Sequence, residues 1–191
     1  MNHQLILFCG PSGSGKTTVV HSLLEKFPQF IFSVSATTRP QRINEKDGVD
    51  YYFLSEEEFR EKIKKEEFLE WEEVYPGRFY GTLKEEVNRK LEQGHIVLFD
   101  VDVKGGLSVK KYFGKQVMDV FIMPPSLTVL KQRLEARESE TQESLEKRLA
   151  KSGLELSFAD QFSYIIVNDE LQKTIREAEL LVNDFINRKP A

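Results

Sequence analysis

A chain of 191 residues with 40% hydrophobic and 30% charged side chains is long enough to bury the core of one ordinary globular domain. Its formal net charge of −4 argues against an extended nucleic-acid surface, because phosphate backbones attract basic proteins. The single cysteine, Cys9, has no disulfide partner, and no apolar run approaches the roughly 20 residues that span a bilayer. We therefore expect a cytoplasmic protein that binds neither nucleic acid nor membrane.

The first predicted elements are a strand, a glycine-rich turn and a helix, in that order. The apolar run Leu5–Cys9 predicts a buried strand, and residues 16–26 predict an amphipathic helix. Between them, GPSGSGKT at residues 10–17 matches a P-loop, whose glycines let backbone N–H groups point at phosphate oxygens. Lys16 would pair with the β- and γ-phosphates, and the Thr17 hydroxyl is placed to ligate Mg²⁺. The pattern predicts a nucleoside triphosphate site made of Gly10, Pro11, Ser12, Gly13, Ser14, Gly15, Lys16, Thr17 and Thr18.

Strands and helices alternate along the rest of the chain. Short apolar runs predict strands at Ile96–Asp100, Val117–Met123 and Tyr164–Val167. Amphipathic stretches predict helices at 83–93, 126–137, 144–157 and 170–187. Nearly continuous apolar strands are typical of sheets covered on both faces, so the predicted fold class is α/β, with a parallel P-loop sheet flanked by helices.

Two helix starts carry the capping-box pattern, a serine or threonine followed by a glutamate three residues later. Ser55 with Glu58 and Thr82 with Glu85 both fit this pattern. Gly94 follows the second of these helices, where a left-handed C-terminal cap would lie.

Two regions break the alternation. Residues 34–81 are rich in turns, with strand-like runs at 51–54 and 68–74 and a helix at 55–66, which predicts a small α+β insert. Residues 134–155 are densely charged and helical in pattern. We expect one domain with two inserts, its core formed by residues 1–33, 82–133 and 156–191.

A series of short motifs then gives the chain a family resemblance. In chain order these are SATTRPQR (35–42), GVDYYF (48–53), FLEW (68–71), FYGT (79–82), LFDVD (98–102), PPS (124–126), KQRL (131–134) and IVND (166–169). Together with the P-loop they resemble the guanylate kinase family, whose members move phosphate from ATP to GMP. The resemblance covers essentially the whole chain. It implies a GMP-binding insert at 34–81, a helical lid at 134–155, ATP and GMP as substrates with dGMP as a further acceptor, and Mg²⁺ as cofactor.

The resemblance assigns the acceptor phosphate to the insert. Arg39 and Arg42 form a compact cationic pair suited to a phosphate monoester, and in the family they hold the GMP phosphate with the Tyr51 and Tyr80 hydroxyls.

The acceptor base has its own expected contacts. Glu70 lies between large apolar residues, and a carboxylate there can accept both N1–H and N2–H₂ of guanine, a donor pair that adenine lacks. Ser35 and Thr82 match family positions that touch the base.

Two acids follow the second predicted apolar strand. Asp100 ends that strand, where α/β sheets deliver side chains to the ligand, and such an acid commonly supports the Mg²⁺ of the P-loop through water. Asp102 points to the same side of an extended chain. The family places both near metal and GMP, although one of them could instead be a helix N-cap.

The charged second insert suggests catalytic arginines. Arg133 and Arg137 are four residues apart and would share one helix face; with Arg148 they resemble a lid that closes over the triphosphate. Lys16 and these three arginines are the predicted catalytic residues. Asn168 follows the last predicted strand, where the family approaches the adenine of ATP, although a surface turn is an alternative interpretation.

Two other functions stay open at this point. One is an interaction module that keeps the fold but binds protein partners, and the other is a P-loop kinase with a different acceptor. Complete nucleotide motifs disfavour the first, and Glu70 with Thr82 disfavours a pyrimidine acceptor.

Overall fold

Five parallel strands form the central sheet of the computed structural model, which describes residues 5–136 and 142–187. Their order is β2 (Phe30–Phe32), β7 (Ile96–Asp100), β1 (Leu5–Cys9), β8 (Val117–Met123) and β9 (Tyr164–Val167). The bounds of β1, β7, β8 and β9 are those that the apolar runs predict. The sequence analysis missed β2, whose three residues are too few to show a pattern.

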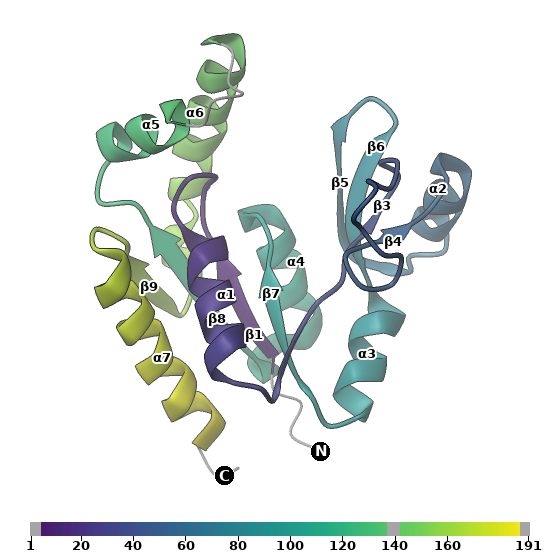
Figure 1. Cartoon of the computed structure of the whole chain (residues 1–191), viewed down its shortest axis with the longest axis horizontal. Coiled ribbons are helices and arrows are strands. Elements are labelled where there is room, and N and C mark those ends of the chain that lie inside the picture. Colours follow the sequence, from purple (N-terminus) through teal and green to yellow (C-terminus); the bar gives the residue numbers. More distant parts are fainter. Residues whose placement is uncertain (1–4, 137–141, 188–191) are drawn as a thin grey trace.

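Helices cover both faces of this sheet, so the predicted α/β class is confirmed (Figure 1). The helices α1 (Lys16–Lys26) and α7 (Leu171–Asn187) pack on the face that presents Ile6 and Phe8. The helices α3 (Lys84–Glu92) and α4 (Val103–Phe113) pack on the opposite face, which presents Leu5 and Leu7. Two 3₁₀ turns, η1 (Gly114–Gln116) and η2 (Ala159–Gln161), lead into β8 and towards β9.

The helix α4 was not predicted, because Gly105 and Gly106 lower the helical propensity of its first turn. Both glycines lie where α4 packs closely against other side chains. A Cβ on Gly106 would lie 2.1 Å from Cys9 Sγ, and a Cβ on Gly105 would lie 3.1 Å from Glu70 Oε2. Both residues let the helix approach its neighbours more closely than any larger side chain allows.

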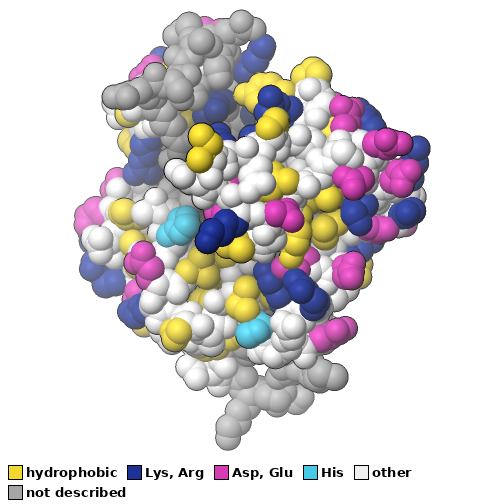
Figure 2. All heavy atoms as spheres, turned by 45° about the vertical axis from the view of Figure 1, so that its right-hand side comes forward, with side chains coloured by type: hydrophobic (Ala, Val, Ile, Leu, Met, Phe, Trp, Pro, Cys, Tyr) yellow, Lys and Arg dark blue, Asp and Glu magenta, His cyan; other side chains and the backbone are white. Residues whose placement is uncertain are grey.

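The α+β insert has its own small sheet, in the order β4 (Tyr52–Phe53), β3 (Ala36–Thr37), β6 (Arg78–Leu83) and β5 (Phe68–Tyr75). The helix α2 (Glu56–Lys64) packs Phe59 against Phe68 and Phe79, with ring centroids 4.3 and 5.3 Å apart. On the face that Figure 2 shows, acidic and basic side chains are interspersed. The domain boundaries stay a prediction, and β6 continues to Leu83, past the expected end of the insert at 81.

The helices α5 (Leu127–Glu135) and α6 (Gln142–Leu156) are joined by an apolar cluster of Leu130, Leu134 and Leu145. The lid expected at residues 134–155 stays a prediction, and residues 137–141 within it lie outside the described part of the chain. In Figure 1 these helices and the insert stand on either side of the carboxyl ends of the central strands. Within residues 5–136 and 142–187, no helix combines the length and the apolar character needed to cross a bilayer.

One of the two capping boxes is confirmed and the other is wrong. Ser55 accepts from the Glu58 N–H, and the Glu58 carboxylate accepts from the Ser55 N–H. The helix α3 begins after Leu83 instead, because the Thr82 hydroxyl donates to Glu70. Gly94 has the expected left-handed conformation, with φ of 82°.

The packing of α4 gives a test with two helical glycines. Gly106→Ala would force a Cβ into Cys9, so we expect a loss of about 1–3 kcal/mol in the free energy of unfolding. Gly153→Ala on α6 meets no described atom within 4 Å and should instead gain about 0.5–1 kcal/mol through helix propensity. Urea unfolding measures both. A shift of the same sign in the two variants would contradict the close approach of α4 to β1.

Candidate active site

The P-loop follows β1 and ends at the first turn of α1, as predicted. Gly10 and Gly15 have φ of 147° and 93°, and Gly15 is the N-cap of α1. A Cβ on Gly10 would lie 2.4 Å from the Ile122 carbonyl oxygen, so the loop has no room for a side chain there. The Ser14 hydroxyl is buried and has no hydrogen-bond partner within the described part of the chain. The free N–H groups at the N-terminus of α1 make this loop suited to an anion.

The Asn168 side chain binds the backbone of the P-loop. Its side chain is buried, with Nδ2 donating to the Ser14 carbonyl at 2.7 Å and Oδ1 accepting from Thr174 Oγ1 at 3.0 Å. The Asn168 N–H donates to the carbonyl of Met123 at the end of β8. Both ends of the amide therefore serve the protein, and the expected contact with adenine stays a prediction.

Lys16 and Thr17 lie at the start of α1. Across residues 5–136 and 142–187, the Lys16 ammonium has no hydrogen bond or ion pair, which leaves it available to a ligand. Thr17 Oγ1 donates to Asp100 Oδ2 at 2.5 Å, and Asp100 ends β7 beside Phe8 of β1. Hydroxyl and carboxylate oxygens are the ligand types that Mg²⁺ prefers, so the pair fits this ion. No cluster of three or more His, Cys, Asp or Glu able to hold a metal is found among the described residues, so the phosphates would supply further oxygens.

The lid arginines are only partly within the described residues. Arg133 lies on α5, and its Nη2 donates to the Asn168 carbonyl at 2.9 Å and, more weakly, to the Asp169 carbonyl at 3.5 Å. Arg133 Nη1 is buried and has no partner among the described atoms. Arg148 lies half-buried on α6, while Arg137 falls outside the described residues. A buried, unpaired guanidinium nitrogen above a phosphate loop suits an anionic ligand.

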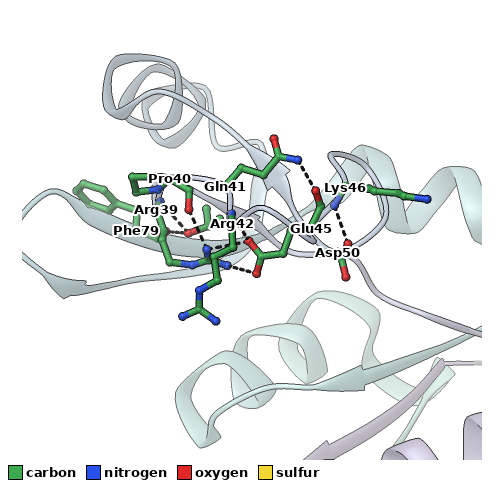
Figure 3. Close-up of polar contacts among 9 residues, drawn as sticks. Arg39, Pro40, Gln41, Arg42, Glu45, Lys46, Asp50 and Phe79 are labelled. Carbon is green, nitrogen blue, oxygen red and sulfur yellow. Dashed lines mark hydrogen bonds and ion pairs between the residues drawn. The ribbon is translucent and has the colours of Figure 1, made fainter. Parts of the chain in front are cut away.

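Arg39 is held by a residue that the sequence analysis missed (Figure 3). Glu45 accepts from Arg39 Nη1 and Nη2 at 2.9 and 2.7 Å, and the guanidinium stacks 5.2 Å from the centroid of Tyr51. The hydrogen bonds from Arg39 and from the Arg42 N–H lower the pKa of Glu45 to about 2, and Glu45 in turn raises the pKa of Arg39. Glu45 is therefore ionised at any physiological pH, and it fixes Arg39 in one orientation.

Arg42 contacts Glu45 through its backbone and not through its guanidinium. Its N–H donates to Glu45 Oε2 at 2.8 Å, while its exposed guanidinium extends away from Glu45 without a hydrogen bond or ion pair among the described residues (Figure 3). Tyr51 and Tyr80 lie edge to face, with centroids 6.1 Å apart. The structure thus brings the four residues expected for the acceptor phosphate into one part of the insert, with one arginine fixed and the other free.

The residues expected for the acceptor base also converge. Thr82 Oγ1 donates to Glu70 Oε1 at 2.6 Å. A Cβ on Gly105 would lie 3.1 Å from Glu70 Oε2 and 3.3 Å from Asp102 Oδ1, so the two acids are neighbours at this glycine. Asp102 is the N-cap of α4, with Oδ1 accepting from the Gly105 N–H at 2.8 Å. The alternative that one of the two acids is an N-cap is therefore confirmed for Asp102. Ser35 is half-buried next to β3, where its carbonyl accepts from the Tyr52 N–H.

Comparison with known proteins agrees with this arrangement. The family model described as guanylate kinase matches residues 2–185. The chain belongs to the guanylate kinase family. It is 47% identical to a guanylate kinase of Bacteroides thetaiotaomicron over 99% of this chain and 93% of that protein, and 46% identical to one of Salinibacter ruber over 97% and 98%. A crystal structure of guanylate kinase from Anaplasma phagocytophilum superposes with a TM-score of 0.71 at 30% identity, covering 97% of this chain and 87% of that one.

In this member of the family, Glu70 lies in an environment that opposes its charge. Burial raises the pKa of Glu70 to about 7, and the neighbouring carboxylates of Asp102 and Glu72 act in the same direction, while the hydrogen bond from Thr82 opposes them. A carboxylate with a raised pKa destabilises the fold when it ionises, unless a ligand donates hydrogen bonds to it. The hydrogen bond from Thr82 therefore offsets only part of the cost of ionising Glu70, and a ligand that donates further hydrogen bonds would lower that cost.

Two charged residues of α6 were missed because no local pattern marks them. Lys151 Nζ lies 2.9 Å from Glu72 and 3.2 Å from Asp102. Glu155 is buried, and burial raises its pKa to about 6. These residues come from parts of the chain that meet only in the folded protein, so spacing in the sequence could not reveal them.

The pKa of Glu70 predicts a pH-dependent effect on stability. Because the pKa is raised from an ordinary 4.5 to about 7, the folded state loses stability as the pH rises between these values. Glu70→Gln removes the charge, so at pH 8 we expect the variant to unfold with a higher free energy than the wild type, by about 3 kcal/mol at most. At pH 4 the two proteins should be equally stable. Urea unfolding at both pH values checks this, and an equal difference at both would mean that ionisation is not the cause.

Proposed function

We propose that this chain transfers the γ-phosphate of ATP to GMP, giving ADP and GDP, in an Mg²⁺-dependent reaction of purine nucleotide metabolism. The observation that carries the choice of acceptor is the half-buried Glu70, which accepts from Thr82, on the same chain as a complete P-loop. Family membership supports the class of reaction.

The donor binds at the P-loop. Backbone N–H groups of the P-loop and of the N-terminus of α1 hold the phosphates of ATP, and Lys16, which has no partner among the described residues, reaches the β- and γ-phosphates. Thr17 and Asp100 hold Mg²⁺, the acid through water. When bound, the ion neutralises charge on the β- and γ-phosphate oxygens.

The acceptor binds on the insert. Arg42 and the remaining donors of Arg39 pair with the GMP phosphate, together with the Tyr51 and Tyr80 hydroxyls. Ionised Glu70 accepts from N1–H and N2–H₂ of guanine, and Ser35, Thr82 and Asp102 complete the contacts with the base. None of these residues is assigned to the ribose 2′-hydroxyl, so dGMP is expected to serve as an acceptor too.

The transfer itself needs positioning and charge neutralisation more than a general base, because the GMP phosphate is already a nucleophile near neutral pH. Lys16 and Arg133 stabilise charge on the transferred group, and Arg137 and Arg148 join them when the lid closes. A closed lid also keeps water from competing with GMP. The cytoplasm, where ATP and GMP are available, is the proposed location.

A panel of acceptors tests the reaction. We expect ADP release from ATP and Mg²⁺ with GMP and with dGMP, but not with AMP, CMP or UMP, because only guanine donates two hydrogen bonds to Glu70. A coupled assay for ADP measures this. In Glu70→Gln the KM for GMP should rise far more than that for ATP. Activity with AMP equal to that with GMP would overturn the acceptor assignment, and no activity with any acceptor would favour a binding module.

Two lysines at opposite ends of α1 test the donor site. Lys16→Met should lower kcat by at least about a hundredfold, because it removes a charge that acts on the transferred phosphate, while GMP binding stays measurable by calorimetry. Lys26→Met is the control, since Lys26 pairs with Glu179 on α7, away from the P-loop. Near-normal turnover of the Lys16 variant would show that the loop does not hold the donor phosphates.

A further inference from the structure

Lys151 links three parts of the molecule that are distant in sequence. From α6 of the lid, its ammonium contacts Glu72 Oε1 at 2.9 Å on β5 of the insert and Asp102 Oδ2 at 3.2 Å at the start of α4 in the core. Glu155, one turn further along α6, lies at 4.0 Å. This one ammonium therefore lies among carboxylates from the lid, the insert and the core.

The carboxylates around Lys151 belong to the acceptor side of the active site. A cavity of about 260 Å³ has four carboxylates and one lysine in its lining, which consists of Glu70, Trp71, Glu72, Glu73, Asp102, Lys104, Gly105 and Ser108. Several negative charges in so small a space repel one another, and burial weakens the screening of that repulsion by water. Lys151 is the cation that the structure places in contact with both Glu72 and Asp102.

The contact with Lys151 also affects the position of the Asp102 carboxylate. Asp102 Oδ1 accepts from the Gly105 N–H at 2.8 Å, and Lys151 Nζ lies 3.2 Å from Oδ2, so both oxygens of the carboxylate have a partner. The Asp102 carboxylate lies against Glu70, since both approach the same face of Gly105. Lys151 thus acts on an acid that adjoins the expected reader of the acceptor base.

Stability alone does not explain this arrangement. The Lys151 side chain is 45% exposed, and ion pairs with that much access to water contribute little to folding because solvent screens them. A role in arranging the neighbouring acids is consistent with the contacts, and removal of the lysine should leave the protein folded.

We propose that Lys151 is a positioning residue for the acceptor nucleotide, which acts through Asp102 and Glu72 and ties the lid helix α6 to the side of the site that holds the acceptor base. The inference rests on the proposed function, because it takes the insert as the acceptor site. It follows that the position of α6 and the affinity for the acceptor are coupled, while the donor site at the P-loop does not depend on Lys151.

The test compares Lys151→Met with Lys151→Arg in steady-state assays that vary GMP and ATP separately. We expect the methionine variant to raise the KM for GMP about tenfold, with kcat and the KM for ATP within about twofold of the wild type, because only uniform binding of the acceptor is lost. Lys151→Arg keeps the charge and should recover most of the affinity for GMP. Glu72→Gln combined with Lys151→Met should also bring the KM for GMP back towards the wild type, because it removes the repulsion that Lys151 relieves.

Lys26→Met is the matched control, since Lys26 makes a comparable ion pair between helices at 54% side-chain exposure. It should change neither KM, and both methionine variants should melt within a few degrees of the wild type. An unchanged KM for GMP in Lys151→Met, or an equal loss for both nucleotides without recovery by arginine, would overturn the inference. If the wild type itself fails to phosphorylate GMP, the proposed function fails instead, and the two failures are distinguishable.

Discussion

The turn after β9 contacts both the P-loop and helix α5 through a single residue, Asn168. The buried Asn168 amide bonds the Ser14 carbonyl, and the Asn168 backbone carbonyl accepts from Arg133 of α5. A buried polar group that lost its partner would be left desolvated without compensation, so these bonds hold the P-loop and α5 in one relative position. The shape of the donor site therefore depends on a residue whose side chain faces the protein.

The acceptor side is organised by charge. Glu45 holds Arg39 in place, but it also neutralises part of the charge that a phosphate would meet. Arg42, with no such partner within the described residues, keeps its full charge available. In the proposed acceptor site, Arg39, which is fixed in advance, would lose less conformational freedom on binding and would orient the phosphate, while Arg42 would supply most of the attraction.

The sequence predicts well what depends on local pattern. Each of the four recovered strands is mostly apolar, although β7 ends in Asp100 and β8 contains Asp119, and the P-loop needs only residue types at fixed spacing. The helix α4 was missed because its glycines serve contacts with Cys9 and Glu70, which lie elsewhere in the chain. Thr82 failed as a cap for the same reason, since its hydroxyl has a stronger partner in Glu70, and a charged acceptor on the neighbouring strand is invisible to a pattern of three residues.

The cost of burying Glu70 is itself an argument about recognition. A carboxylate with a pKa raised to about 7 gains most from a ligand that donates two hydrogen bonds, because those bonds also relieve its desolvation. A base without these donors would leave the half-buried carboxylate with only its hydrogen bond from Thr82, and it would bind more weakly than if the site were apolar. Selectivity of this kind arises because the wrong base does not donate hydrogen bonds to the carboxylate. It requires that the protein without ligand be less stable than a variant with an uncharged residue at this position.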